Sequence, residues 1–309
     1  MNSVDRLMPM LMSTEQLRSR GMTAQSLRRD VQSGTLLRIR PGFFVEKAAA
    51  ELDRADRHLL SALAANAALD RPVFSHASAA LIHGLPDWRL PLRKVSVSEE
   101  STKSGSRSSE IAIAHRVPDL TDHITSVDGL LVTSPERTVT DVALTTKRDT
   151  SVSLADGALR SGLVSPDSLA ASLENASGRH GIKRARDAMS LVDAKCESVA
   201  ETLSRLTFLD HDLPKPETQV EIRNHHGVLV ARVDFFWPEF GVIGECDGFG
   251  KYFNGRTPTE TREQLVKEKD RDAELVALGY RVIHWHWRDI MEPARLAALI
   301  RRVLFSTAQ

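Results

Sequence analysis

Acidic residues within two apolar segments constrain the fold of the C-terminal part more than any other feature of this sequence. Residues 229–237 and 241–247 are rich in apolar and aromatic residues, which predicts two consecutive strands joined by a tight turn. Side chains alternate across a strand, so Glu245 and Asp247 share one face of the second strand, and Asp234 lies on the first. Because both strands are largely apolar, we expect both faces of this sheet to be covered.

Carboxylates close together in a mostly buried sheet repel one another and lose their hydration. A bound cation removes that cost, and hard oxygen ligands suit Mg²⁺ or Mn²⁺. The alternative is that each acid caps a strand end or lies at the rim of the sheet without binding an ion. The grouping of Asp234, Glu245 and Asp247 within one hairpin favours the cation site.

The helix predicted next, over about 258–278, adds positive charge beside these strands. Val266, Ala273 and Val276 follow its predicted inward stripe, and Lys269 falls within that stripe. The Lys269 ammonium either reaches past the stripe to solvent or points at the strand carboxylates. In the second case it can stabilise charge on a scissile phosphate.

The order of elements in this region is typical of an α/β unit. A helix runs from 197 to about 210, and after the three strands and the second helix come a strand at 281–287 and a last helix at 293–305. His284 and His286 share a face of the strand at 281–287, and we interpret both as structural.

These residues resemble the core of the PD-(D/E)xK nuclease superfamily, and more closely its very-short-patch-repair-like endonuclease domains. The resemblance covers about residues 195–305 and rests on Asp234, the Glu245-Cys-Asp247-Gly turn and the basic residue Lys251. The positions that match the motif, in order, are Glu201, Gln219, Asp234, Glu245, Asp247, Lys251, Lys269 and Arg271. One departure is that Asp247 occupies the place of the superfamily's usual lysine. Either Lys251 or Lys269 supplies the positive charge, or the site is inactive.

The resemblance implies metal-assisted hydrolysis of a phosphodiester bond. Asp234 and Glu245 would hold Mg²⁺ or Mn²⁺, with Glu201 and Asp247 as additional or outer ligands. The ion would lower the pKa of a bound water and polarise the phosphate. Lys251 or Lys269 would stabilise the pentavalent intermediate, and the resemblance gives Gln219 and Arg271 supporting positions.

Residues 14–42 form a basic segment in which six arginines outnumber two acids. Two short helices followed by strand, Pro-Gly turn and strand predict a winged helix-turn-helix. Three residues of the second helix, Gln25, Arg28 and Arg29, face away from its apolar side and are candidates for contacts with bases and phosphates. Arg38 and Arg40 alternate with apolar residues on the wing, so we expect them to project together along a DNA backbone. The alternative is a solvated basic surface of a winged helix that binds protein.

This basic segment also resembles the winged-helix domain of the AbiEi antitoxins of type IV toxin–antitoxin systems, through residues 21–29 and 34–45. Residues 75–86 and 129–141 resemble the linker and second domain of that family, so the resemblance covers about 13–190. It implies a winged helix that binds operator DNA and represses its own operon, with a possible toxin or operon partner.

We identify no catalytic or metal-binding motif in the sequence of the middle part of the chain. His76, His83 and Arg137 lack metal-ligand spacing and a paired nucleophile, so we interpret them as structural. The Ser/Gly-rich stretch 99–110 is expected to be an exposed loop.

Composition limits the class of protein. Lys plus Arg and Asp plus Glu are both 41, and the net charge of zero excludes a uniformly basic nucleic-acid coat protein. Two cysteines exclude a disulfide framework and fit a reducing compartment. Without a run of about 18 apolar residues or a signal peptide, the chain is expected to be cytoplasmic.

We therefore expect an α/β chain, α+β overall, with three domains. These are a winged helix over 1–50, a mixed α/β domain over 51–190 and a restriction-endonuclease-like core over 191–309. One hypothesis for function is a DNA-binding defence or toxin–antitoxin protein with a metal-dependent endonuclease domain. The alternative is a non-catalytic AbiEi-type antitoxin and autorepressor whose nuclease fold only binds nucleic acid or a partner. The expected partner of the chain is double-stranded DNA.

Overall fold

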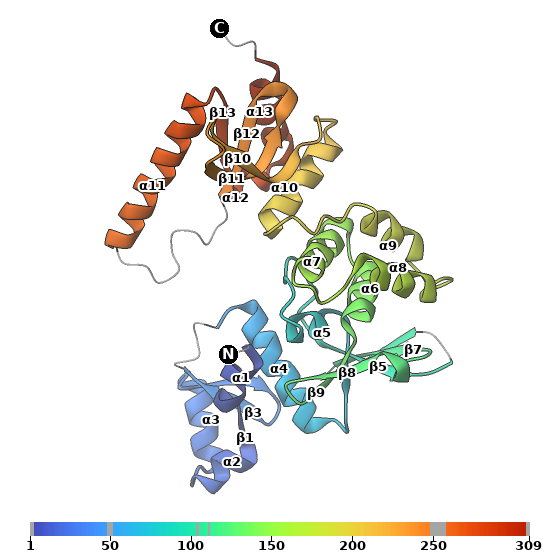
Figure 1. Ribbon diagram of the computed structural model, residues 1–309. Coiled ribbons are helices and arrows are strands. Elements are labelled where there is room, and N and C mark those ends of the chain that lie inside the picture. Colours follow the sequence, from blue (N-terminus) through green and yellow to red (C-terminus); the bar gives the residue numbers. More distant parts are fainter. Residues whose placement is uncertain (1–2, 48–51, 103–104, 111, 248–257, 307–309) are drawn as a thin grey trace. The chain divides into compact units, whose positions relative to one another are not determined.

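The computed structural model describes residues 3–47, 52–102, 105–110, 112–247 and 258–306, with side chains from 267 onward in the last range. The chain divides into two compact units, Met1–Leu191 and Val192–Gln309 (Figure 1). Helices and mixed sheets occur in both units, which confirms the α+β class predicted from the sequence. Among the helices in these ranges, none is long and apolar enough to cross a bilayer.

The first unit begins with the element order of a winged helix-turn-helix. The elements are α1 (Ser3–Leu7), β1 (Met12–Ser13), α2 (Thr14–Ser19), α3 (Ala24–Gln32), β2 (Leu36–Arg40) and β3 (Phe43–Glu46). The strands form a sheet in the order β1-β3-β2. Ser13 and Thr23 each accept a hydrogen bond from the third residue of the helix that follows, and so cap α2 and α3. Leu17, Leu36 and Phe44 pack beneath the two helices.

The rest of this unit is a six-stranded mixed sheet covered by helices. Its elements are α4 (Arg54–Ala68), β4 (Val73–Phe74), α5 (His76–Ile82), β5 (Val95–Glu100), β6 (Gly105–Ser108), β7 (Ala112–Val117), β8 (Ile124–Val127), β9 (Leu130–Thr133), α6 (Pro135–Thr145), α7 (Arg148–Arg160), α8 (Pro166–Asn175) and α9 (Ile182–Met189). The sheet order is β6-β7-β5-β4-β9-β8. The predicted loop at 99–110 instead contains β6, an exposed edge strand. Its polar residues suit an edge that faces water.

The second unit follows the predicted order of helix, three strands, helix, strand and helix, with one short extra helix. Its elements are α10 (Val199–Asp210), β10 (Glu217–Arg223), β11 (Leu229–Trp237), β12 (Val242–Asp247), α11 (Pro258–Ala277), β13 (Arg281–His286), α12 (Trp287–Ile290) and α13 (Pro293–Phe305). The sheet order is β10-β11-β12-β13, and only the pair β12–β13 is parallel.

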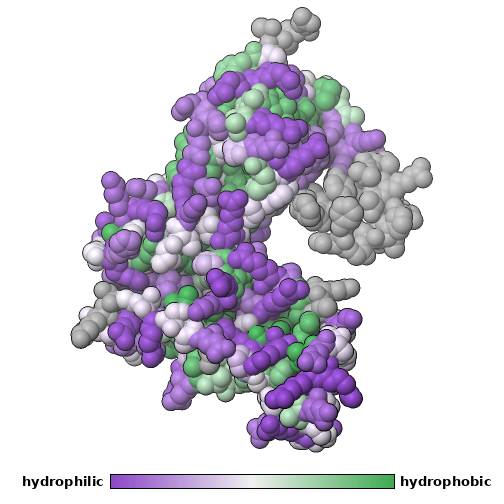
Figure 2. Space-filling model, turned by 180° about the vertical axis from the view of Figure 1, so that it is seen from behind, coloured by the Kyte–Doolittle hydropathy of each residue, from purple (hydrophilic) through white to green (hydrophobic). Residues whose placement is uncertain are grey.

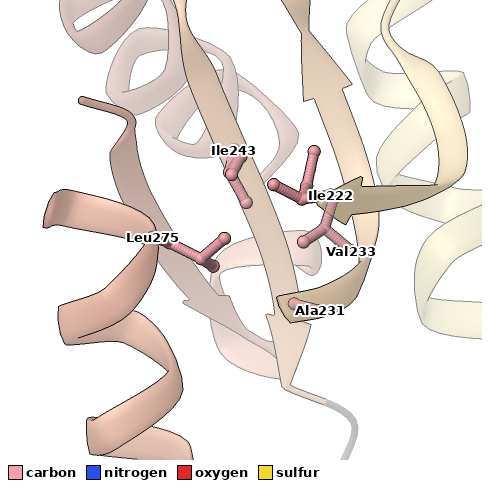
Figure 3. Close-up of a cluster of buried hydrophobic side chains, with 5 residues drawn as sticks. All are labelled: Ile222, Ala231, Val233, Ile243 and Leu275. Atoms are coloured by element: carbon pink, nitrogen blue, oxygen red, sulfur yellow. The ribbon is translucent and has the colours of Figure 1, made fainter. Parts of the chain in front are cut away.

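Helix α11 covers one face of this sheet through Leu275, which packs with Ile222, Val233 and Ile243 (Figure 3). The predicted inward stripe was wrong, because Val276 is 58% exposed and Leu275 is fully buried. Lys269 is exposed as well. The side of α11 that faces the sheet includes Arg271, which lies over the polar end of the sheet. Because Arg271 is charged, a search for apolar residues did not identify this side of the helix.

Aromatic side chains fill the opposite face of the same sheet. The ring of Phe208 on α10 meets the rings of Phe235, Trp237 and Trp285 edge-on, with centroids 5.4 to 5.7 Å apart. Gly244 leaves room for this cluster, since a Cβ atom there would lie 2.7 Å from the Trp285 ring. The aromatic packing therefore depends on a glycine at that position.

Replacing Gly244 by alanine should destabilise the second unit by about 1–3 kcal/mol, because the added methyl group overpacks the aromatic cluster. Urea unfolding of the Gly244→Ala protein measures the loss. The same substitution in a Trp285→Phe background should be less costly, since the smaller ring relieves the clash. Equal losses in the two backgrounds would show that Trp285 is not the limiting contact.

Candidate nucleic-acid interface and acidic cluster

Three arginines from separate elements surround one hollow on the winged-helix part of the chain. Arg18 of α2, Arg28 of α3 and Arg38 of β2 line this hollow of about 350 Å³. Its floor is apolar and is formed by Leu17, Met22, Leu27, Val31 and Phe44. Among the described residues, none of these three arginines has an acidic partner within ion-pair distance. The surface of this end of the chain is mostly hydrophilic (Figure 2).

Of the residues predicted to contact nucleic acid, only Arg28 and Arg38 line this hollow. Gln25, Arg28, Arg29 and Arg38 are exposed. Arg29 lies 3.5 Å from Asp30. Arg18 was missed by sequence reasoning, which assigned contacts only to the second helix and the wing, although Arg18 belongs to the same group of six arginines.

Arg40 does not project together with Arg38 as expected. The ladder between β2 and β3 shifts register between the two arginines, and this irregularity ends the simple alternation of side chains. Arg40 is half-buried, and burial lowers the pKa of its guanidinium although Glu110 opposes that effect. Of the two wing arginines, only Arg38 therefore lines the hollow.

In the second unit, the amide of Gln219 joins two carboxylates. Its Nε2 donates to Oε2 of Glu201 at 2.9 Å and to Oδ1 of Asp234 at 3.1 Å. Gln219 adopts a positive φ of 52°, and the β10–β11 ladder makes no pair between it and Asp234. Such a conformation costs a side-chain-bearing residue about 1–2 kcal/mol, so the sheet stores strain at this cluster.

Where β11 and β12 separate, the carboxylate of Asp234 takes the place of a backbone carbonyl as hydrogen-bond acceptor. The ladder between β11 and β12 ends at the pair Phe235–Gly244. Two residues beyond Gly244 along the unpaired edge, Cys246 N donates to Oδ2 of Asp234 at 2.8 Å. Both oxygens of this predicted metal ligand thus already accept hydrogen bonds from the protein.

Glu201 is a buried acid with its own set of donors. Its Oε2 accepts from the backbone N of Glu197, and its Oε1 accepts from the hydroxyl of Ser198. Burial raises the pKa of the Glu201 carboxyl, the charge of Asp234 raises it further, and the donated hydrogen bonds oppose both effects. Glu201 is therefore easier to protonate than an ordinary glutamate.

Glu245 lies on the face of β12 that α11 covers. It is 2% exposed, and Nη2 of Arg271 lies 3.3 Å from its Oε1. Arg271, predicted as a supporting residue, thus pairs directly with a predicted metal ligand. Such a buried pair is costly to break, because either partner alone leaves a buried charge.

Two histidines that sequence reasoning took as structural contact Asp247. Its Oδ2 lies 3.5 Å from Nδ1 of His284 and 3.5 Å from Nδ1 of His286. Nε2 of His284 lies 2.9 Å from Oδ2 of Asp272. The hydrogen bond with Asp247 raises the pKa of His284 against the opposing effect of burial, and Asp272 raises it further. The alternation of His284 and His286 along β13 was the signal that could have found them.

The predicted catalytic and metal residues therefore separate into small groups, each with partners of its own. Glu201 and Asp234 meet at Gln219, whereas Glu245 pairs with Arg271. Within the described residues, no three His, Cys, Asp or Glu side chains converge so that they could hold a metal ion. Lys251 lies outside the described residues. The predicted Mg²⁺ or Mn²⁺ stays a prediction, and we assign no metal-dependent step to these residues.

Comparison with known proteins finds a family match within the first unit. Residues 73–191 match the family model of the AbiEi antitoxin C-terminal domain, which confirms that part of the resemblance seen in the sequence. The endonuclease part stays a prediction.

Two similar proteins come from Mycobacterium tuberculosis. They are the uncharacterized protein MT2308 of strain CDC 1551 and the uncharacterized protein Rv2248 of strain H37Rv. Each is 35% identical over 179 residues, which is 58% of this chain and 63% of the relative. The matched region thus spans less than two thirds of either relative.

Glu201 should make the stability of the second unit depend on pH. Its carboxyl has a raised pKa in the folded state, so its contribution to the free energy of unfolding is present below the ordinary value of 4.5 and is lost as pH rises through the folded pKa. Glu201→Gln cannot ionise, so its stability should fall less over this interval. Urea unfolding at a series of pH values from 4.5 upward measures the difference. Glu217→Gln, on an exposed residue of β10, is the control, and parallel profiles for wild type and Glu201→Gln would contradict the expectation.

Proposed function

We propose that this chain is a DNA-binding repressor of antitoxin type, in which the winged helix contacts DNA and the AbiEi-like domain contacts a partner protein. The observation that carries the first half is the group Arg18, Arg28 and Arg38. Three guanidiniums from two helices and a wing surround one hollow without acidic partners among the described residues. Unpaired surface arginines attract the phosphates of a duplex through counterion release.

The element order suits this role. In helix-turn-helix proteins the second helix lies in the major groove and its first residues approach base edges. Here that helix is α3, and Gln25 and Arg28 are exposed within its first two turns. A glutamine can pair with adenine and an arginine with guanine, whereas Arg18 and Arg38 flank the helix and suit phosphates.

The second half of the proposal is supported by the match at residues 73–191. A domain of this family implies a toxin or DNA as a partner of the chain. The match covers β4 to α9, the elements of the six-stranded sheet and its helices, and leaves the winged-helix part outside. We therefore assign DNA contact to the winged helix and protein contact to the matched domain.

We do not extend the proposal to phosphodiester hydrolysis. Asp234 holds the edge of β12 through Cys246 N, and Glu245 pairs with Arg271. Both acids thus have structural partners in the described part of the chain. We propose that the second unit supports binding and that its acids stabilise the sheet.

Arginines of the hollow should set the salt dependence of DNA binding. The double variant Arg28→Ala with Arg38→Ala should bind a duplex from upstream of its own gene more weakly, with a salt slope smaller by about 1.8, because each phosphate contact contributes about 0.9. Fluorescence anisotropy over a series of KCl concentrations measures the slope.

Arg160→Ala removes one exposed arginine at the end of α7 and serves as the control for loss of a positive charge outside the hollow. It should leave the slope unchanged. If the double variant also keeps the wild-type slope, the winged helix binds protein rather than DNA. Gln25→Ala should weaken binding to the upstream duplex more than to an unrelated one.

The absence of hydrolysis has a direct test. Supercoiled plasmid incubated with the purified protein and Mg²⁺ or Mn²⁺ should stay as intact as with Asp234→Asn or Glu245→Gln. Circular dichroism checks that both variants fold. Nicking by the wild type that disappears in both variants would contradict the proposal and establish the endonuclease instead.

A further inference from the structure

A polar pocket lies within the antitoxin-type domain, between α6, α8 and the segment that follows β7. Its volume is about 270 Å³, and Arg137, Arg179 and Asn175 contribute to its wall. Asp119 and Asp122 lie on the wall formed by the segment after β7. All these residues fall within the region that matches the AbiEi domain, and neither DNA binding nor the acidic cluster of the second unit uses them.

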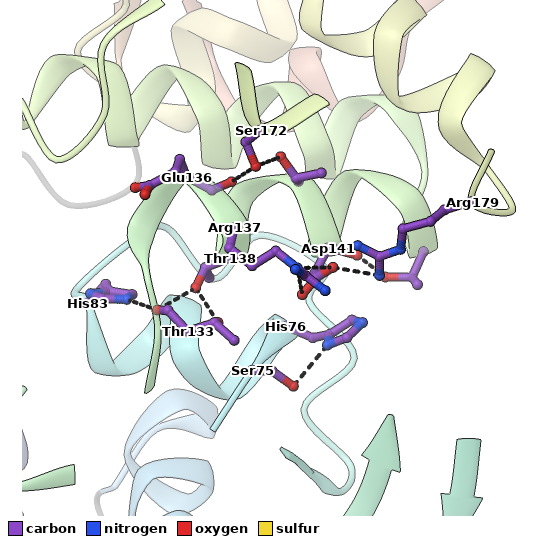
Figure 4. A network of polar contacts seen from close by, with 12 residues as sticks. Ser75, His76, His83, Thr133, Glu136, Arg137, Thr138, Asp141, Ser172 and Arg179 are labelled. Carbon is purple, nitrogen blue, oxygen red and sulfur yellow. Dashed lines mark hydrogen bonds and ion pairs between the residues drawn. The ribbon is translucent and has the colours of Figure 1, made fainter. Parts of the chain in front are cut away.

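A single buried carboxylate fixes both arginines of this pocket (Figure 4). Nε of Arg137 lies 3.1 Å from each oxygen of Asp141, and Nη2 of Arg179 lies 2.7 Å from Oδ1 of the same residue. Asp141 is fully buried. The two guanidiniums are therefore held side by side before any ligand arrives, which removes most of the entropy cost of ordering them.

Most of the donors on these arginines are not used by Asp141. The side chain of Arg137 is only 8% exposed, and in the described part of the chain its Nη atoms donate to no other group. An arginine has five N–H donors in a planar fork that suits a carboxylate or a phosphate. Because Arg137 lines the pocket, these remaining donors are available to a group that enters it.

The charge of the pocket selects one kind of anion. At the arginine end of the pocket, two guanidiniums and the carboxylate of Asp141 leave one positive charge, whereas Asp119 and Asp122 make the wall formed by the segment after β7 negative. A single carboxylate neutralises that charge. A phosphate brings two negative charges, which exceed the one positive charge at the arginines, and Asp119 and Asp122 would repel it. The small volume also suits a side chain better than a nucleotide.

We propose that this pocket receives the carboxylate of one Asp or Glu side chain of a partner protein, bound by Arg137 and Arg179. The proposal rests on the proposed function in one respect, that the domain binds a protein. Asp119 and Asp122 then face a basic or polar residue beside the inserted acid. The pocket would recognise a partner through one buried charge-assisted pair, the type of contact that dominates many interfaces.

The test uses the full-length protein labelled with ¹⁵N-arginine and the short blocked peptide acetyl-Gly-Glu-Gly-amide as probe. The Nε–H signals of Arg137 and Arg179 should shift and saturate on titration, whereas acetyl-Gly-Gln-Gly-amide should leave them unmoved. Arg179→Ala should weaken the binding at least tenfold, and Arg179→Lys should restore part of it. Arg186→Ala removes a nearby exposed arginine that pairs with Glu174, and it should bind like the wild type.

Three results would overturn the proposal. These are equal shifts with the Glu and Gln peptides, equal weakening in Arg179→Ala and Arg186→Ala, or binding of inorganic phosphate without binding of the peptide. DNA binding of Arg179→Ala separates this site from the repressor function. Lost peptide binding with intact DNA binding supports the pocket, whereas failure of the DNA-binding proposal appears in the winged-helix variants and leaves the peptide titration unaffected.

Discussion

The carboxylate of Asp141 is the buried charge around which the domain that matches the AbiEi model is organised. Burial by itself would raise the pKa of this carboxyl, but His76 and the guanidiniums of Arg137 and Arg179 reverse the effect and hold the pKa lowered, so the group stays ionised. Arg137 comes from the same helix, and Arg179 comes from the segment after α8. Their shared partner ties α6 to that segment. Losing either arginine would leave Asp141 less well compensated in the interior, which destabilises the domain.

Local signals in the sequence predicted the elements that local interactions determine. Ser13 and Thr23 precede helices as capping residues, and the turn at Pro41-Gly42 separates two strands as expected. The order of elements in the second unit also followed from periodicity, because its strands and helices carry the usual apolar patterns. These features depend on residues within one turn or one hairpin of each other.

The candidate sites were harder to predict, because each depends on a break in a regular pattern. Arg40 leaves the wing surface at a register shift, and Gln219 reaches two carboxylates from a backbone with positive φ. Helix α11 turns Arg271 toward the sheet because Glu245 lies beneath it. For Gln219 and Arg271 a partner distant in the sequence decides where the side chain points, and for Arg40 the register shift of the hairpin does. Neither alternation nor helical periodicity contains that information.

The net charge of zero combines two different electrostatic arrangements. In the second unit the acids have internal partners, since the amide of Gln219 compensates Asp234 and the guanidinium of Arg271 compensates Glu245. On the winged-helix part, Arg18 and Arg28 have no such partners among the described residues. Compensated acids gain little from a cation, because hydrogen bonds already replace their lost hydration. Uncompensated arginines still gain from an anion, and this gain is the electrostatic basis of the DNA contact proposed for the winged helix.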